Sequence, residues 1–322
     1  MAFTITERRP AGDIDKNWAA LASDDDGSNL LAGATAGRLY TSTNSGSSWT
    51  ERQPAGNYSF TWQSAASDAD GSYLIVGHTQ KLFTSANGGV DWTERQPAGA
   101  VTKSWLAVAS DSDGSNLLAG TPERLYLSSD SGVSWAEKKP AGSVLRAWFA
   151  LASDGDGSNL IAGTNTFGVG GQRLYTSADS GSSWTERQPA GDVDVAWLSV
   201  ASDDDGTNLI AASSVRLYTS SNSGVSWTER TPAGTGDKEW RCVASDADGS
   251  HLIAGISTGR LYVSSDGGVT WAEQRPVGDT DAQWVSVASD ADGTNLFVSN
   301  NKRLYTLTPV LAQPDAVWFQ MI

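Results

Sequence analysis

One short motif recurs seven times along this chain of 322 residues, and it constrains the fold more than any other feature. The motif begins with tryptophan, as in Trp18-Ala-Ala-Leu-Ala-Ser-Asp, and its copies follow at intervals of 43 to 49 residues. The leading tryptophans are Trp18, Trp62, Trp105, Trp148, Trp197, Trp240 and Trp284. Repeats of about 40–45 residues that contain several strands are typical of propeller blades. Seven copies therefore predict seven blades that begin near these residues.

Each repeat contains four short segments that are typical of β-strands. The first starts at the leading tryptophan, and the others lie, for example, at 116–120, 173–177 and 183–188. Asp-x-Asp-Gly, Gly- or Ser-rich links and Pro-Ala-Gly separate them as turn signals. No segment shows a sustained apolar period of about 3.6 residues, so we expect no helices. We predict an all-β fold, a single seven-bladed β-propeller of four-stranded antiparallel blades over residues 1–322.

The two ends of the chain are out of phase with the repeat. Residues 5–12 match residues 49–56, so the chain opens on a fourth strand. The last repeat reaches its third strand at 303–306 and then loses the pattern. We predict that residues 2–10 complete the last blade and close the ring, which pairs a sheet edge that would otherwise stay open. The alternative is that the segment 316–320, Ala-Val-Trp-Phe-Gln, supplies this strand.

Small residues follow every leading tryptophan at fixed positions. The second residue after it is Ala, Ser or Cys, and the fourth is always Ala. Such residues suit an innermost strand that is crowded around a central channel. Cys242 occupies one of these positions, so we interpret it as a small buried residue rather than a reactive thiol. Because it is the only cysteine, an internal disulfide is excluded.

The charge and hydropathy of the chain exclude some partners. A net charge of −15 argues against nucleic acid, because phosphate binding needs a basic surface. No window approaches the roughly 18 apolar residues of a membrane span, and residues 1–10 do not resemble a signal peptide. We expect a monomer that does not insert into membranes. The compartment stays open, with the cytoplasm slightly favoured.

A second motif, Ser-x-Asp/Asn-x-Gly-x-x-Trp, precedes the fourth strand in six repeats. Its copies lie in phase at 42–49, 85–92, 128–135, 177–184, 220–227 and 264–271. The motif resembles the Asp-box, or bacterial neuraminidase repeat, with Asn44, Asn87 and Asn222 in place of Asp and with the seventh copy missing. This resemblance covers nearly the whole chain and implies a sialidase-like propeller. In that family the Asp-box is a structural turn on the face opposite the ligand site.

The resemblance does not extend to the residues that a sialidase needs. Sialidases use an arginine triad, a tyrosine nucleophile with an acidic partner, and usually a Phe/Tyr-Arg-Ile-Pro motif, which is missing here. One basic residue precedes Leu-Tyr or Leu-Phe in each repeat, and seven equivalent charges favour a structural ring over a triad. These residues are Arg38, Lys81, Arg124, Arg173, Arg216, Arg260 and Arg303. We therefore expect no enzymatic activity, and a sialidase-like glycoside hydrolase is the least favoured alternative.

Two further patterns are candidates for metal binding. Asp-x-Asp-Gly occurs in all seven repeats, as at 24–27, and resembles part of a calcium loop. Residues such as Ala22 and Leu30 stand where such a loop needs further acids, so we interpret the pattern as a hairpin turn. His78 and His251 fall at unrelated repeat positions with no Ser or Cys motif nearby. We expect neither a metal nor a cofactor.

Differences among the copies point to a binding face. The loops from Pro-Ala-Gly to the next tryptophan share a face with the loops between second and third strands, and the resembling family binds ligands on this face. Four neighbouring blades carry acids there: Asp13, Asp15, Asp192, Asp194, Asp237, Glu239, Asp279 and Asp281. The other three blades carry 57–60, 100–103 and 143–146, with Lys103 and Arg146 among apolar residues. The fourth blade also has an insertion at 164–171.

We predict that a protein partner binds the apolar half of this face. Exposed apolar clusters commonly mark contact surfaces, and Tyr and Arg are frequent interface anchors. The predicted contact residues are Tyr58, Phe60, Leu145, Arg146, Phe167 and Val169. The alternative function is a lectin that binds glycans at repeated sites between blades, where the seven leading tryptophans stack against sugars. Core packing explains these tryptophans as well and is favoured.

Overall fold

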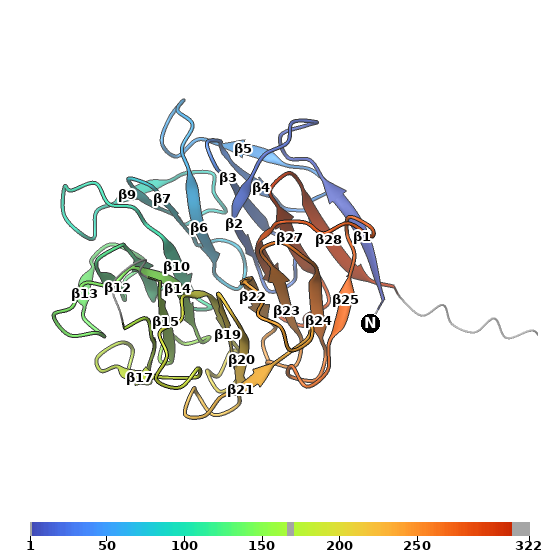
Figure 1. Cartoon of the computed structure of the whole chain (residues 1–322). Coiled ribbons are helices and arrows are strands. Elements are labelled where there is room, and N and C mark those ends of the chain that lie inside the picture. Colours follow the sequence, from blue (N-terminus) through green and yellow to red (C-terminus); the bar gives the residue numbers. More distant parts are fainter. Residues whose placement is uncertain (1, 166–170, 311–322) are drawn as a thin grey trace, which may run out of the picture.

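The computed structural model describes residues 2–165 and 171–310. In this part of the chain, 28 strands form seven four-stranded antiparallel sheets, arranged as blades around a central axis (Figure 1). The predicted seven-bladed β-propeller is confirmed. These residues form no helix, and accordingly none that is long and apolar enough to cross a membrane.

The two inner strands of each blade are formed by the leading-tryptophan motif and by the apolar run that follows it. The innermost strands are β2 (Trp18–Ser23), β6 (Trp62–Ser67), β10 (Ala107–Ser110), β14 (Trp148–Ser153), β18 (Trp197–Ser202), β22 (Trp240–Ser245) and β26 (Trp284–Ser289). The second strands are β3 (Leu30–Ala34), β7 (Leu74–His78), β11 (Leu117–Gly120), β15 (Leu160–Thr164), β19 (Leu209–Ser213), β23 (Leu252–Ile256) and β27 (Leu296–Asn300). The second strands are buried along their whole length, because the neighbouring blades cover both faces of each sheet.

The two outer strands flank the Ser-x-Asp/Asn-x-Gly-x-x-Trp motif, whose turn is called the Asp-box turn below after the motif that it resembles. The third strands are β4 (Leu39–Ser42), β8 (Leu82–Ser85), β12 (Leu125–Ser128), β16 (Leu174–Ser177), β20 (Leu217–Ser220), β24 (Leu261–Ser264) and β28 (Leu304–Pro309). The outermost strands are β1 (Phe3–Arg8), β5 (Thr50–Arg52), β9 (Thr93–Arg95), β13 (Ala136–Lys138), β17 (Thr185–Arg187), β21 (Thr228–Arg230) and β25 (Ala272–Gln274). Most outermost strands are shorter than predicted. The residues just before each of these strands belong to the turn instead of the sheet. For example, the amide of Ser183, two residues before β17, donates to the Asp179 carboxylate at 2.7 Å.

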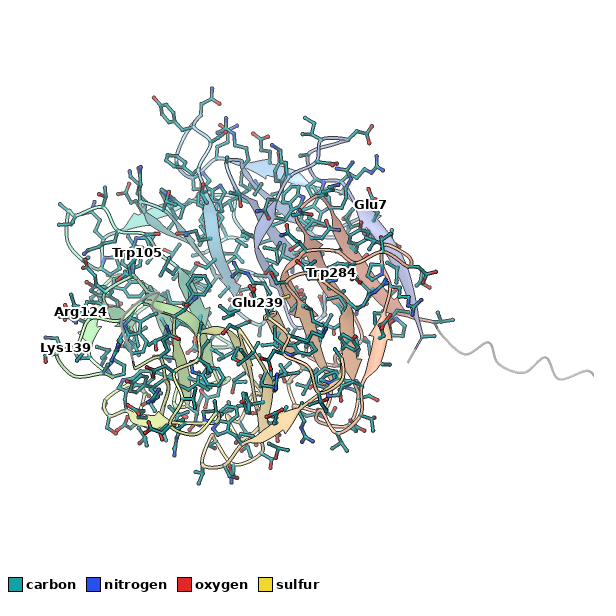
Figure 2. The ribbon with its side chains drawn as sticks, in the orientation of Figure 1. Glu7, Trp105, Arg124, Lys139, Glu239 and Trp284 are labelled. Carbon is teal, nitrogen blue, oxygen red and sulfur yellow. The ribbon has the colours of Figure 1, made fainter. Side chains whose placement is uncertain are left out.

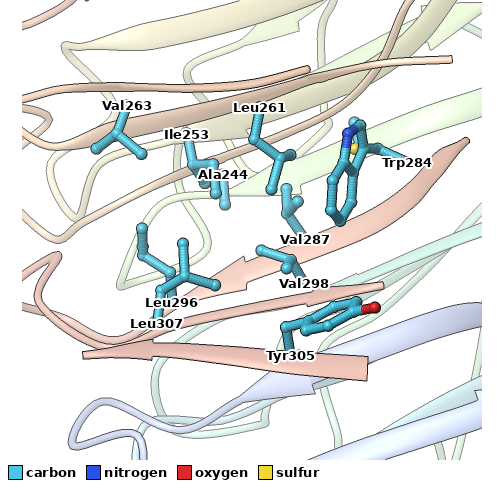
Figure 3. Close-up of a cluster of buried hydrophobic side chains, with 11 residues drawn as sticks. Ala244, Ile253, Leu261, Val263, Trp284, Val287, Leu296, Val298, Tyr305 and Leu307 are labelled. Carbon is cyan, nitrogen blue, oxygen red and sulfur yellow. The ribbon is translucent and has the colours of Figure 1, made fainter. Parts of the chain in front are cut away.

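Apolar clusters between neighbouring blades form the core. Figure 3 shows one of them, where Leu261 and Val263 of one blade meet Trp284, Val298 and Tyr305 of the next. All seven leading tryptophans lie in such clusters, and each is only 1–2% exposed. The innermost strands also contact one another in sequence around the whole axis, from β2 through β26 and back to β2. The core is therefore continuous around the ring.

The N-terminal strand closes the ring. β1 pairs antiparallel with β28, from Phe3 opposite Pro309 to Arg8 opposite Leu304, and completes the blade formed by β26, β27 and β28 (Figure 1). The predicted closure by residues 2–10 is therefore confirmed, and the alternative segment 316–320 lies outside the described residues. The pairing also explains the missing seventh Asp-box. In this blade the third and outermost strands come from opposite ends of the chain, so no loop joins them.

Backbone hydrogen bonds link all seven blades at one end of the axis. The second residue of each Asp-x-Asp-Gly turn donates its amide to the carbonyl of the same residue in the next blade, at 2.8–3.0 Å. The order of the bonds is Asp25, Ala69, Ser112, Gly155, Asp204, Ala247, Ala291 and again Asp25. These bonds form a closed circle, in which each blade is both a donor and an acceptor.

Candidate functional site

The loops of the propeller form two distinct faces. The Asp-box turns lie with the Asp-x-Asp-Gly turns, as the bond from the Ser45 amide to the Ser28 carbonyl shows (3.0 Å), and this side is called the Asp-box face below. On the opposite side, Gly37 and Phe60 exchange two backbone bonds, which join the loop between β3 and β4 to the loop between β5 and β6. This side, called the variable face, carries the loops at 9–17, 53–61, 96–104, 139–147, 188–196, 231–239 and 275–283.

The seven repeated basic residues form ion pairs at the periphery of the blades. Each pairs with a glutamate of the adjacent outermost strand, for example Arg124 with Glu137 at 3.1 Å and Arg303 with Glu7 at 3.0 Å. Arg124 lies toward the outer edge of the ring in Figure 2, whereas Glu239 lies close to its middle. The seven residues are thus spread around the ring rather than brought together as a triad.

The acidic loops of the variable face bind these same arginines. Arg173 pairs with Asp192 at 2.9 Å and also with Asp194, and in the next three blades the repeated arginine pairs with one loop acid. The further pairs are Arg216 with Asp237, Arg260 with Asp281, and Arg303 with Asp15. The Gly171 amide and Arg173 lower the pKa of Asp194. These acids therefore hold their own loops in place, and much of the negative charge predicted for this half is neutralised within the chain.

The aromatic residues predicted to bind a partner differ in exposure. Tyr58 is 74% exposed, whereas Phe60 is half-buried beneath it, with ring centroids 6.4 Å apart. Phe60 stacks on the buried ring of His78 at 4.5 Å and packs edge-on against Trp62. Phe60 therefore supports Tyr58, and its contact with His78 leaves it less exposed to a partner than predicted. The sequence does not reveal this contact, because the two residues are 18 positions apart in the chain.

Of the remaining predicted residues, Leu145 and Arg146 lie in the loop 139–147, just before the fourth blade. Leu145 is 52% exposed. The guanidinium of Arg146 lies so close to Gly171 that a Cβ at this glycine would collide with it, so Arg146 packs against the end of the insertion. Phe167 and Val169 lie outside the described residues.

The variable face exposes more apolar residues than predicted. Large apolar side chains are exposed on five successive loops around the ring, from 9–17 to 188–196. They are Ile14, Tyr58, Val101, Val144, Leu145 and Val193, and this set is called the apolar arc below. The loops at 231–239 and 275–283 contribute no residue to it. The arc covers the three loops predicted from the sequence and extends to one further loop on either side.

The seven leading tryptophans have no accessible ring face. Each is 1–2% exposed, and six of them pack against a tyrosine of the third strand, as Trp18 does with Tyr40 at 5.6 Å. A sugar cannot stack on a ring that its own blades cover. Their burial supports core packing and disagrees with the sugar-stacking role considered above.

A cavity of about 370 Å³ lies on the axis of the ring. All seven innermost strands line it, and Asn17, Thr35 and Thr61 place it at the end near the variable face. The buried Cys242 also contributes to the wall, and burial raises the pKa of its thiol to about 12, as expected for an unreactive cysteine. Among the residues that the structure describes, Arg241 is the only charged one in the lining. The repeat pattern alone does not mark it as a site residue.

The Asp-x-Asp-Gly segments are hairpin turns. The buried Asp111 carboxylate accepts bonds from the Asn116 amide at 3.0 Å and from its side chain at 2.6 Å, while Gly114 adopts a φ of 71°. Two turns differ. Tyr73 replaces this asparagine in the second blade, and His251 replaces it in the sixth, where its Nδ1 lies 2.7 Å from the Asp246 carboxylate. Potential ligand atoms of Asp246, Asp248 and His251 lie within 4.8 Å of one another. The Asp246–His251 contact takes the place of the asparagine bond, so it explains this cluster without a metal.

Comparisons with known proteins support the fold. No protein-family model and no curated protein matches this sequence. Among solved structures, "YCF48 bound to D1 peptide" is similar with a TM-score of 0.71 at 13% identity, over 96% of each chain. YCF48 from Cyanidioschyzon merolae has a TM-score of 0.70 at 16% identity, over 95% of this chain and 98% of its own. The GH74 enzyme of Niastella koreensis has a TM-score of 0.55 at 17% identity, over 88% of this chain and 62% of its own.

Proposed function

We propose that this protein is a non-catalytic interaction propeller that binds a protein partner through the variable face. The observation that carries the proposal is the apolar arc, whose six large side chains are between 47% and 74% exposed. Exposed apolar surface of this kind costs solubility unless a partner covers it. Tyr58 has the further property of an interface anchor, because Phe60 and His78 support its ring from below.

Two other observations agree with this proposal. Asp194 pairs with Arg173 and Asp15 pairs with Arg303, and these ion pairs fix the two end loops of the arc, 188–196 and 9–17, before any partner arrives. Loops that are already ordered lose less entropy on binding. The similar structure of YCF48 has a bound peptide of D1, so a propeller of this shape can bind a polypeptide. The resemblance to Asp-box proteins also supports a site on the variable face, because in those proteins the Asp-box turns lie on the face opposite the ligand.

The docking face can be tested with a photo-crosslinking amino acid placed at Tyr58, at Leu145 or at Val269. Val269 is 66% exposed on the Asp-box face, so it is a control of similar exposure. We expect one protein of the native host to crosslink at Tyr58 and Leu145 but not at Val269. With that protein purified, Tyr58→Ser and Leu145→Ser should each weaken binding about tenfold or more, as for interface anchors, and Val269→Ser should have no effect. Crosslinking at Val269 alone would place the site on the Asp-box face.

The proposal also predicts that a fluorogenic sialoside is not hydrolysed. A sialidase needs arginines that converge on one carboxylate, whereas Arg38 and Arg124 already pair with Glu51 and Glu137 in separate blades. Turnover that disappears in the Arg38→Ala or Arg124→Ala variant would overturn the non-catalytic assignment. A glycan array tests the lectin alternative in the same way, and binding of a defined glycan would favour it.

A further inference from the structure

The central cavity is lined by one set of equivalent residues that differ widely among the blades. The residue directly after each leading tryptophan faces this space. Around the ring these residues are Ala19, Gln63, Leu106, Phe149, Leu198, Arg241 and Val285. The second and fourth residues after each tryptophan are all small. The first residue after it, in contrast, ranges from Ala19 to Phe149 and Arg241. The position therefore gives the cavity its own shape and charge, separately from the packing of the blades.

Arg241 is bonded differently from the other arginines. Thirteen arginines in the described part of the chain make an ion pair or a hydrogen bond. Within that part, the Arg241 guanidinium makes no ion pair or hydrogen bond, and it lies over the ring of Phe149, two blades away, at 5.6 Å. A guanidinium has five N–H donors in a planar fork, and a cation–π contact uses none of them. These donors are therefore available to a ligand in the cavity.

We propose that the central cavity binds a small organic monocarboxylate, whose carboxylate pairs with Arg241 and whose apolar body lies against Leu106, Phe149 and Leu198. The volume of about 370 Å³ falls at the lower end of the roughly 300–1,000 Å³ of small-molecule pockets. The site is separate from the apolar arc, so this proposal does not depend on the protein partner proposed above.

The chemistry of the ligand follows from that of the wall. A carboxylate matches the planar fork of a guanidinium and can accept two parallel hydrogen bonds. The described residues supply the lining with a single cation and no acid, so they balance one negative charge but not a second. Leu106, Leu198 and Val285 give the wall an apolar part, against which the hydrocarbon part of the ligand lies. Gln63, Ser199 and Ser286 add polar groups to the same wall, which leave room for polar substituents on the ligand. The five bonded arginines of the outermost strands, which donate to threonines of the third strands, supply no competing cation here.

The test is an NMR titration of the full-length protein with benzoate and, separately, with its neutral analogue benzamide. We expect benzoate to shift the backbone amides of Ser64, Ser199 and Ser286, which line the cavity, and to bind at least about tenfold more tightly than benzamide. Arg241→Leu is a matched variant, because leucine occupies the equivalent position at Leu106 and Leu198. This variant should keep the melting temperature and lose the preference for benzoate. Arg241→Lys should retain part of it.

Three results would overturn the proposal. They are no shift with benzoate, equal affinity for benzoate and benzamide, and unchanged benzoate binding in the Arg241→Leu variant. If that variant unfolds, the comparison of benzoate with benzamide in the unmodified protein still decides the matter. None of these results bears on docking through the apolar arc, which the crosslinking experiment tests with other residues.

Discussion

His78 is a buried imidazole in a setting that disfavours its charged form. Its Nδ1 accepts a bond from the Gln80 amide at 3.0 Å, while its Nε2 is buried without a hydrogen-bond partner in the structure. Burial, followed by the positive charge of Lys81, lowers the pKa of His78 to about 4, although Glu94 acts in the opposite direction. The folded protein therefore holds this ring neutral well into the acidic range.

This shift predicts a loss of stability as the pH falls. The pKa is 6.5 in the unfolded chain and lower in the folded one, so above about pH 6.5 neither state is protonated at this residue. Between about pH 6.5 and 4 only the unfolded state takes up the proton, and the free energy of unfolding falls by up to about 3 kcal/mol. Urea unfolding measured at several pH values in this window should show the loss.

The variant His78→Thr should remove that part of the pH dependence. Threonine occupies the equivalent position at Thr121 and Thr164, so the blade accepts it. The control is His251→Asn, which replaces a half-exposed histidine by the residue of most other turns and should leave the contribution of His78 in place. An identical pH dependence in His78→Thr and the unmodified protein would show that another group is responsible.

At the residue scale, the sequence predicted whether a side chain is buried or exposed better than it predicted which side chains it contacts. The leading tryptophans and Cys242 are buried as the repeat indicated. Phe60 was placed on the surface, but a ring from another strand packs beneath it. The loop acids and the repeated arginines were both recognised, yet about 20 residues separate Arg173 from Asp194, and only the fold brings them together. Contacts between such residues depend on loop geometry that no local pattern specifies.

At the scale of single elements, the strand that matters most is β1. It covers the free edge of β28, and Phe3 and Ile5 pack against the core cluster between the last two blades. Partial burial of these two side chains is worth roughly 2 kcal/mol. Deletion of residues 1–9 should therefore lower the melting temperature and expose the edge of β28.

A synthetic peptide of residues 2–10 provides the control for this deletion. Added in excess, it should bind the truncated protein and restore the melting temperature, because its partner strand is intact. A truncated protein that melts like the full chain would mean that β1 contributes little to closure. The sequence predicted this element correctly, because residues 5–12 repeat the pattern of a fourth strand. It did not predict where the other outermost strands begin, because the turns before them bind the preceding residues through side-chain hydrogen bonds.

At the scale of the whole molecule, the repeat predicted the number of blades but not what joins them. The circle of seven backbone hydrogen bonds uses Asp, Ala, Ser and Gly at one position, so no side chain marks it in the sequence. A central channel was expected from the small residues after each leading tryptophan, but the residues that line its cavity were not predicted, for a related reason. Its lining comes from seven segments that are far apart along the chain, and its single cation becomes conspicuous only when they share one space.

The pairing of β1 with β28 has a consequence for how the protein is made. A ribosome produces β1 about 300 residues before its partner β28. At about 5–20 residues per second, the first strand waits roughly 15 to 60 seconds for a place in the ring. During this time it is an unpaired strand, which invites aggregation unless charges or polar residues protect it. Its sequence, Phe-Thr-Ile-Thr-Glu-Arg, alternates apolar residues with threonines and ends in two charges, and this pattern suits a strand that must stay soluble until the seventh blade is complete.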